Sequence, residues 1–136
     1  EVIMAQAPLP NGAGGYQFND GNVGEALLFT QAAPATYAAV GTLTAADLAG
    51  GFIQYTGSTS PYLTLPTVAD LEAVISSAKV NSAFNFNVLA SGSGSPEIGT
   101  ATGWTLVGSM TVATTTATAF RARKTGTGTW TLYRVA

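Results

Sequence analysis

The sequence predicts a mainly β fold, an antiparallel jelly-roll-like sandwich with one short α-helix and an extended N-terminal arm. Three observations predict it: apolar and polar residues alternate with a period of two in several short segments, turn-forming residues separate these segments, and a single longer segment has helical periodicity. The 136 residues fit one domain. We expect an arm over residues 1–35 and a β-sandwich over residues 36–136.

Residues 1–35 differ from the rest of the chain in their density of proline and glycine, which prevents a long helix or strand. The same segment contains too many apolar side chains for a solvated tail. We interpret it as an extended arm that becomes ordered by docking, either on another protein or on its own core. The arm residues expected to bind a partner are Tyr16, Phe18, Asn19, Asp20, Leu28 and Phe29.

Residues 36–66 predict short strands joined by turns. The segments 36–40, 52–56 and 62–65 are rich in β-branched and aromatic residues, as strands are. Residues 45–49 precede two glycines, so we expect a single helical turn there, and residues 57–61 are expected to form a loop.

Residues 67–79 predict the longer helix. Thr67 is a favourable N-cap, and Asp70 follows it at the spacing of a capping box. Lys79, near the predicted end, suits the helix dipole. Apolar side chains spaced by three and four residues form a stripe that must pack on a sheet, and they are Val68, Leu71, Val74, Ile75 and Ala78.

The rest of the chain again has strand periodicity. Strands are predicted over 83–88, 104–112, 117–123 and 129–135. The alternation places Phe86 and Phe120 toward the core and Arg121 and Arg123 toward solvent. Residues 91–96 read Ser-Gly-Ser-Gly-Ser-Pro and predict a flexible loop.

The composition excludes several classes of function. The chain has no His and no Cys, which rules out the usual zinc sites, disulfides, thiol catalysis and a Ser-His-Asp triad. Five basic residues and a net charge of −2 argue against nucleic-acid binding. No apolar run approaches the roughly 20 residues of a membrane span. We expect no cofactor, no metal and no membrane partner.

Charged residues are scarce and sorted along the chain. They make up 9% of it, against about 25% in an average soluble domain. Six of the seven acidic residues precede Lys79, and all five basic residues lie at Lys79 or after it. Interfaces between proteins are depleted of charge, and opposite signs can steer assembly. The alternative is a monomer covered by neutral polar groups, with its charges intermixed in space.

Three basic residues close together, Arg121, Arg123 and Lys124, predict a basic strand face. Such a face could bind an acidic partner through charge-assisted hydrogen bonds. The alternative is that its charges protect a sheet edge from stray pairing.

Aromatic side chains and paired acids are the remaining candidates for chemistry. The aromatic residues that could stack on a sugar, or pack in the core as such residues more often do, are Tyr55, Tyr62, Trp104, Trp130 and Tyr133. Glycoside hydrolysis needs two carboxylates about 5–10 Å apart. Asp70 and Glu72 are two residues apart on the predicted helix and so point to different faces. We therefore expect no enzymatic activity.

The order of short motifs in residues 62–136 carries a resemblance. The chain runs from Leu-Pro-Thr at 65–67 through the helix to Ser-Ala-Phe-Asn-Phe-Asn-Val at 82–88, Gly-Trp-Thr-Leu-Val-Gly at 103–108, Phe-Arg-Ala-Arg-Lys-Thr-Gly at 120–126 and Thr-Trp-Thr-Leu-Tyr-Arg-Val at 129–135. This order resembles the small decoration, or cement, proteins of tailed-bacteriophage capsids, and residues 15–22 share a looser likeness.

The resemblance implies a jelly-roll-like domain that assembles as a homotrimer on the outer surface of the virion capsid, binds the major capsid protein and stabilises the shell. It implies no catalytic residue and no cofactor. It supplies no binding motif that maps residue by residue, so the contact residues named above come from the sequence pattern alone. The alternative, from another class, is a carbohydrate-binding fibre-tip or adhesin domain of a virion.

Overall fold

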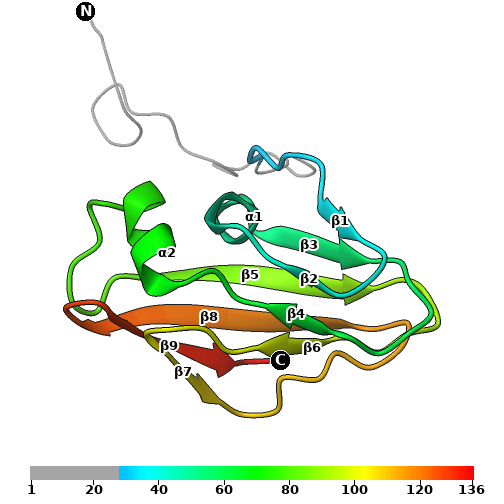
Figure 1. Cartoon of the computed structure of the whole chain (residues 1–136). Helices are drawn as coiled ribbons and strands as arrows, with labels where there is room; N and C mark the ends of the chain where they lie inside the picture. The colour runs from blue at the N-terminus through cyan, green and yellow to red at the C-terminus, as the bar shows by residue number, and fades with distance from the viewer. Residues whose placement is uncertain (1–27) are drawn as a thin grey trace, which may run out of the picture. The chain divides into compact units, whose positions relative to one another are not determined.

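The computed structural model describes residues 28–136, of which residues 31–136 form one mainly β unit with two short helices (Figure 1). In chain order the elements are β1 (Ala35–Tyr37), β2 (Gly41–Thr42), α1 (Ala45–Gly50), β3 (Phe52–Tyr55), β4 (Tyr62–Thr64), α2 (Val68–Val74), β5 (Ala83–Ala90), β6 (Glu97–Gly99), β7 (Trp104–Val107), β8 (Ala117–Gly126) and β9 (Thr129–Arg134). None of the helices in this part of the chain is long and apolar enough to cross a membrane.

The strands form two sheets. The larger sheet has the order β1-β3-β5-β8-β9-β7, and the smaller sheet has the order β2-β4-β6. Within the described residues, β8 pairs antiparallel with β5 and with β9, and every other pairing between two named strands is parallel; a single antiparallel bridge joins Glu97 of β6 to Thr111. The larger sheet is therefore mixed and the smaller sheet is parallel throughout.

The expectation of a mainly β fold is confirmed, but the expectation of an antiparallel arrangement is wrong for most strand pairs. A period of two is common to parallel and antiparallel strands, so alternation alone does not reveal strand direction. Parallel neighbours need a long crossover connection. Between β3 and β5 the chain supplies one by forming β4 and α2.

Helix α1 confirms the helical turn expected over 45–49. Thr44 is its N-cap, and a full capping box forms because the Thr44 side chain accepts from the Asp47 amide while the Asp47 carboxylate accepts from the Thr44 amide. The helix stops at Gly51, which adopts a left-handed conformation with φ of 81°.

Helix α2 begins where expected and ends earlier. The Thr67 hydroxyl accepts a hydrogen bond from the Asp70 amide at 3.2 Å, which confirms the predicted N-cap. The predicted end at residue 79 is wrong, because the last helical residue is Val74. Serines at 76 and 77 follow, and serine favours local hydrogen bonds over helix continuation. Lys79 lies in the next turn, where its amide donates to the Ser82 hydroxyl.

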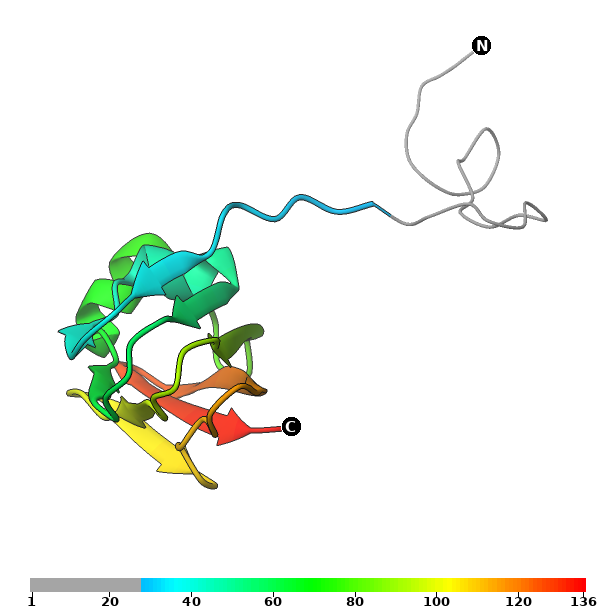
Figure 2. The ribbon, with the colours of Figure 1, turned by 90° about the vertical axis from the view of Figure 1, so that its right-hand side faces the viewer.

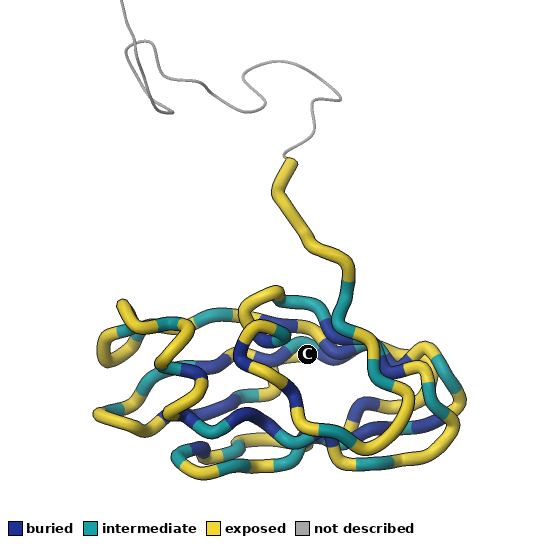
Figure 3. Tube along the Cα trace, turned by 45° about the horizontal axis from the view of Figure 1, so that its top comes forward, coloured by how far each residue is buried: buried dark blue, intermediate teal, exposed yellow. Residues whose placement is uncertain are grey.

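The core lies on one face of the larger sheet. Both helices and the smaller sheet lie against that face (Figures 1 and 2). Buried and exposed positions alternate along the strands (Figure 3). As predicted, Phe86 and Phe120 are fully buried, their rings stacked with centroids 5.5 Å apart, and Arg121 and Arg123 point outward. No helix or strand of the described residues covers the outer face of the larger sheet.

The loop at 91–96, expected to be flexible, is instead packed against the 57–60 loop. Gly94 is buried, and its amide donates to the Gly57 carbonyl at 3.0 Å. The Ser95 hydroxyl donates to the Val112 carbonyl at 2.8 Å. A Cβ at Gly94 would lie 1.9 Å from the Thr59 carbonyl oxygen. Glycine therefore serves close backbone approach here, which composition alone does not distinguish from flexibility.

Candidate functional site

The candidate contact residues of the arm divide into two groups. Tyr16, Phe18, Asn19 and Asp20 lie outside the described residues. Leu28 and Phe29 are described, and they are 86% and 85% exposed. Burying a side chain of this size against a partner contributes about 1.5–3 kcal/mol.

The two outward arginines of β8 lie in a cluster on the outer face of the larger sheet. We call this cluster the arginine face, and its members are Asn81, Asn85, Arg121, Arg123 and Tyr133. Strand register brings the central members together, because Arg121 lies opposite Asn85 of β5 on one side and opposite Tyr133 of β9 on the other. The sequence predicted the outward direction of both arginines but not their neighbours.

Arg123 is held by two neutral partners. Its Nε and Nη2 both donate to the Tyr133 hydroxyl, at 3.1 and 2.7 Å, and its Cζ lies 5.7 Å from the centroid of the same ring. Its Nη1 donates to the Asn81 side-chain oxygen at 2.8 Å. Asn81 has a φ of 76°, a conformation that asparagine tolerates better than most residues, and its amide donates to the Lys124 carbonyl.

Arg121 is held by a single neutral partner, since its Nε donates to the Asn85 side-chain oxygen at 2.8 Å. Within residues 28–136, neither this guanidinium nor that of Arg123 pairs with a carboxylate. The arginine face is therefore positively charged, and its two guanidinium groups are oriented by amide and phenol oxygens alone.

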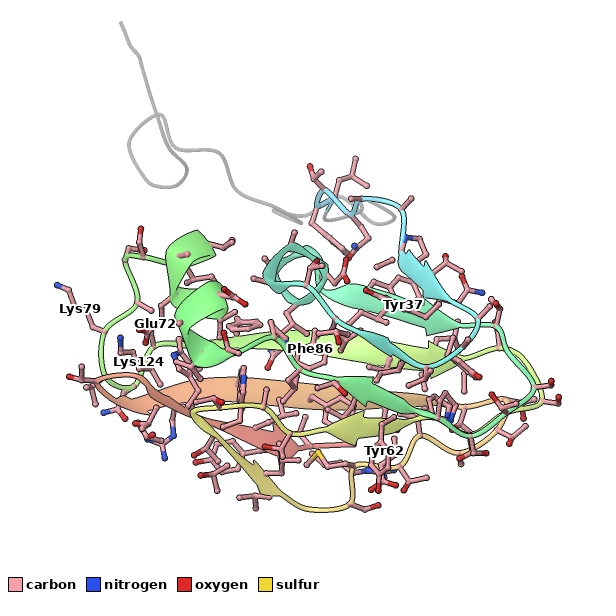
Figure 4. All side chains as sticks on the ribbon, in the orientation of Figure 1. Tyr37, Tyr62, Glu72, Lys79, Phe86 and Lys124 are labelled. Carbon is pink, nitrogen blue, oxygen red and sulfur yellow. The ribbon has the colours of Figure 1, made fainter. Side chains whose placement is uncertain are left out.

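Lys124 does not belong to this face. It alternates with Arg123 along β8 and points to the core side, where its Nζ lies 2.7 Å from the Glu72 carboxylate of α2 (Figure 4). The same oxygen accepts from the Trp130 indole at 3.0 Å. The hydrogen bond from Lys124 and then that from Trp130 lower the pKa of Glu72. The predicted face of three basic residues is therefore wrong for Lys124, because consecutive strand residues point to opposite faces.

Most of the aromatic candidates lie in the core. Tyr55 and Trp130 are almost fully buried and Trp104 is 8% exposed, which confirms the packing interpretation for all three. The Trp104 indole donates to the Pro66 carbonyl at 2.7 Å, just before α2. The hydroxyl of Tyr133 accepts hydrogen bonds from Arg123, and Tyr62 is the one candidate that is mostly exposed, at 57% (Figure 4). A sugar-stacking surface built on either tryptophan is therefore not available.

A groove between the two helices was missed by sequence reasoning. It has a volume of about 630 Å³ and lies beside the N-terminal ends of α1 and α2. Its walls are mainly apolar, and Leu43, Leu65, Pro66 and Val74 contribute to them, with Asp70 as the charged member. The walls come from segments far apart in the chain, so no local pattern in the sequence signals the groove.

The arginine face can donate charge-assisted hydrogen bonds to an anionic partner, and Leu28 and Phe29 can bury apolar surface. Within residues 28–136, no group of three or more acidic side chains is placed to hold a metal ion. No protein-family model matches the chain, and neither the curated proteins nor the solved structures include a significant match to it.

Proposed function

We propose that this chain is a structural virion protein that binds the outside of a phage capsid as a homotrimer and stabilises the shell. The observation that carries the proposal is the exposure of Leu28 and Phe29, 86% and 85%, in a chain with only 9% charged residues. Adjacent large apolar side chains at such exposure are typical of surfaces that bind other proteins. The major capsid protein is the proposed partner.

Repetition on a shell strengthens weak contacts. A homotrimer presents each contact three times, and binding at one subunit raises the effective concentration at the others. Few strong contacts per subunit are then required. The small number of apolar and charged contact residues in the described chain is compatible with such a mode of binding.

The jelly-roll-like sandwich implied by the resemblance is part of the same proposal. Two packed sheets and the antiparallel β5–β8–β9 unit support it. The parallel pairings in both sheets are departures from a regular jelly roll, whose strands are antiparallel.

Imaging of particles tests the capsid proposal. Particles lacking this protein are mixed with the wild type, with the double variant Leu28→Ser/Phe29→Ser, or with the control Val40→Ser, which alters an apolar residue that is 72% exposed elsewhere. Electron microscopy should show added density on the outer surface with the wild type and the control, and little with the double variant. Absence of density with the wild type would contradict the proposal.

Light scattering of the purified protein tests the homotrimer separately. A mass three times that of the chain is expected at the concentrations used for particle binding. A monomer both free and on the particle would contradict the trimeric part of the proposal and leave capsid binding to be judged by imaging.

A further inference from the structure

We propose that the arginine face binds an extended acidic segment of a partner protein, one that carries Asp or Glu at alternate residues. The inference rests on the proposed function in placing the partner in the virion shell, but its test uses the face alone. It is carried by the orientation, spacing and surroundings of Arg121 and Arg123.

The two guanidinium groups are held in place and keep free donors. Asn85 takes only the Nε of Arg121, so both Nη groups of that side chain have no partner among the described residues. Arg123 uses one hydrogen each of Nε, Nη1 and Nη2, which leaves two. Arginine binds carboxylates through two parallel N–H donors. Fixing the side chains before binding reduces the entropy lost on binding.

The spacing of the two arginines selects an extended ligand. They are two residues apart on one strand, so their Cα atoms lie about 6.7 Å apart. Alternate residues of an extended chain have the same separation. Small neighbours, Ala83 opposite Arg123 and Ala119 beside Arg121, leave the face low enough for a second backbone to approach. Carboxylates at positions i and i+2 of an extended segment therefore match both arginines at once.

Charge and sequence argue against other occupants. Two arginines are too few for the row of phosphate contacts that nucleic-acid binding requires. A second copy of this chain is a poor ligand, because its sequence contains acidic residues at alternate positions only at Asp70 and Glu72. These residues lie in a helix, and Glu72 is already bound by Lys124 and Trp130.

Titration with synthetic peptides, followed by NMR of the arginine Nε–H groups, tests the proposal. One peptide carries three glutamates alternating with threonines, and an isomer carries the same three glutamates at every third residue, so that no two of them are two residues apart. The alternating peptide should shift the Nε–H signals of Arg121 and Arg123, and the isomer should bind at least about threefold more weakly because only one pair forms at a time. Arg121→Gln, at an exposed position, should weaken binding of the alternating peptide by a similar factor.

Lys79→Gln is the matched control, since it removes an exposed cation outside the arginine face. It should leave peptide binding unchanged. Equal binding of the two peptides, equal loss in Lys79→Gln and Arg121→Gln, or tighter binding of a sulfated oligosaccharide or an oligonucleotide than of the peptide would each overturn the proposal. Particle imaging with Arg121→Gln tests the capsid proposal and the present inference separately. If the wild-type protein binds the peptide but not the particle, the capsid proposal alone is refuted. If it binds the particle but not the peptide, this inference alone is refuted.

Discussion

The indole nitrogen of Trp130 donates to the Glu72 carboxylate at 3.0 Å, and so joins β9 to α2 across the core. Lys124 of β8 adds an ion pair to the same oxygen at 2.7 Å. Trp104 makes a second attachment through the Pro66 carbonyl, and its ring lies 6.2 Å from that of Trp130. Two tryptophans from neighbouring parallel strands therefore hold a helix of only seven residues, one through the segment just before it and the other through Glu72 in its second half.

Replacing Glu72 should lower stability in two steps. Glu72→Gln keeps an acceptor for the Trp130 indole and loses the ion pair, whereas Glu72→Ala also leaves the buried indole N–H without a partner. Thermal unfolding should therefore rank the wild type above Glu72→Gln and Glu72→Gln above Glu72→Ala. Glu97→Gln, an acidic residue of β6 outside this contact, is the control and should unfold close to the wild type.

The effect of Glu72→Gln should depend on pH. The pKa of Glu72 is held below its ordinary value of 4.5 by Lys124 first and then by Trp130. A lowered pKa means that the ionised form stabilises the fold above the ordinary value and that this stabilisation is lost as the pH falls through the lowered value. The difference in melting temperature between wild type and Glu72→Gln should thus be largest near neutral pH and shrink in acid. A difference that is constant with pH would refute this account.

Tyr37 should titrate later than an ordinary tyrosine. Burial, followed by the hydrogen bond to Asp47 and the charge of that carboxylate, raises its pKa from 10.0 to about 12. Because the neutral phenol is favoured in the folded state, its contribution to stability is complete below pH 10 and is lost as the pH rises through the raised value. Alkaline titration followed by tyrosinate absorbance should therefore include a late step near pH 12.

Two variants assign that late step. Tyr37→Phe should remove it, and Asp47→Asn should move it part of the way back, since burial remains. Tyr62→Phe, at an exposed tyrosine, should leave the late step in place. Persistence of the late step in Tyr37→Phe would assign it to another residue.

Local sequence patterns predicted the features that depend on a few neighbouring residues, namely the direction of side chains along strands and the helix N-cap. The inward direction of Phe86, the outward direction of Arg121 and the N-cap at Thr67 follow from periods and caps that span a few residues. Partners across the fold could not be predicted in this way. Asn81 is 42 residues from Arg123, and Glu72 is 58 residues from Trp130. Their contacts depend on strand order and helix placement, which cannot be read from any short segment of the sequence.

The helix stripe predicted over 67–79 can be tested by comparing two of its residues. Leu71 is fully buried, whereas Val74, at the end of α2, is 56% exposed. Leu71→Ala should lower the free energy of unfolding by about 2–5 kcal/mol through lost burial and a residual cavity. Val74→Ala should change it by less than about 0.5 kcal/mol. Chemical denaturation of both variants measures the contrast, and similar losses would mean that the helix continues past Val74 and buries that face.

Alanine substitutions at two glycines, one in the packed 91–96 loop and one in α1, should change stability in opposite directions. A methyl group at Gly94 would lie 1.9 Å from the Thr59 carbonyl oxygen, and backbone must move to admit it, so Gly94→Ala should destabilise the fold by about 1–3 kcal/mol. Gly50 has no atom within 4 Å of the same position and ends α1, so Gly50→Ala should stabilise the fold by about 0.5 kcal/mol. Denaturant unfolding of both variants measures the sign of the change in the free energy of unfolding. If Gly94→Ala were neutral, the loop would have room to move, and the original expectation of a flexible segment at 91–96 would be restored.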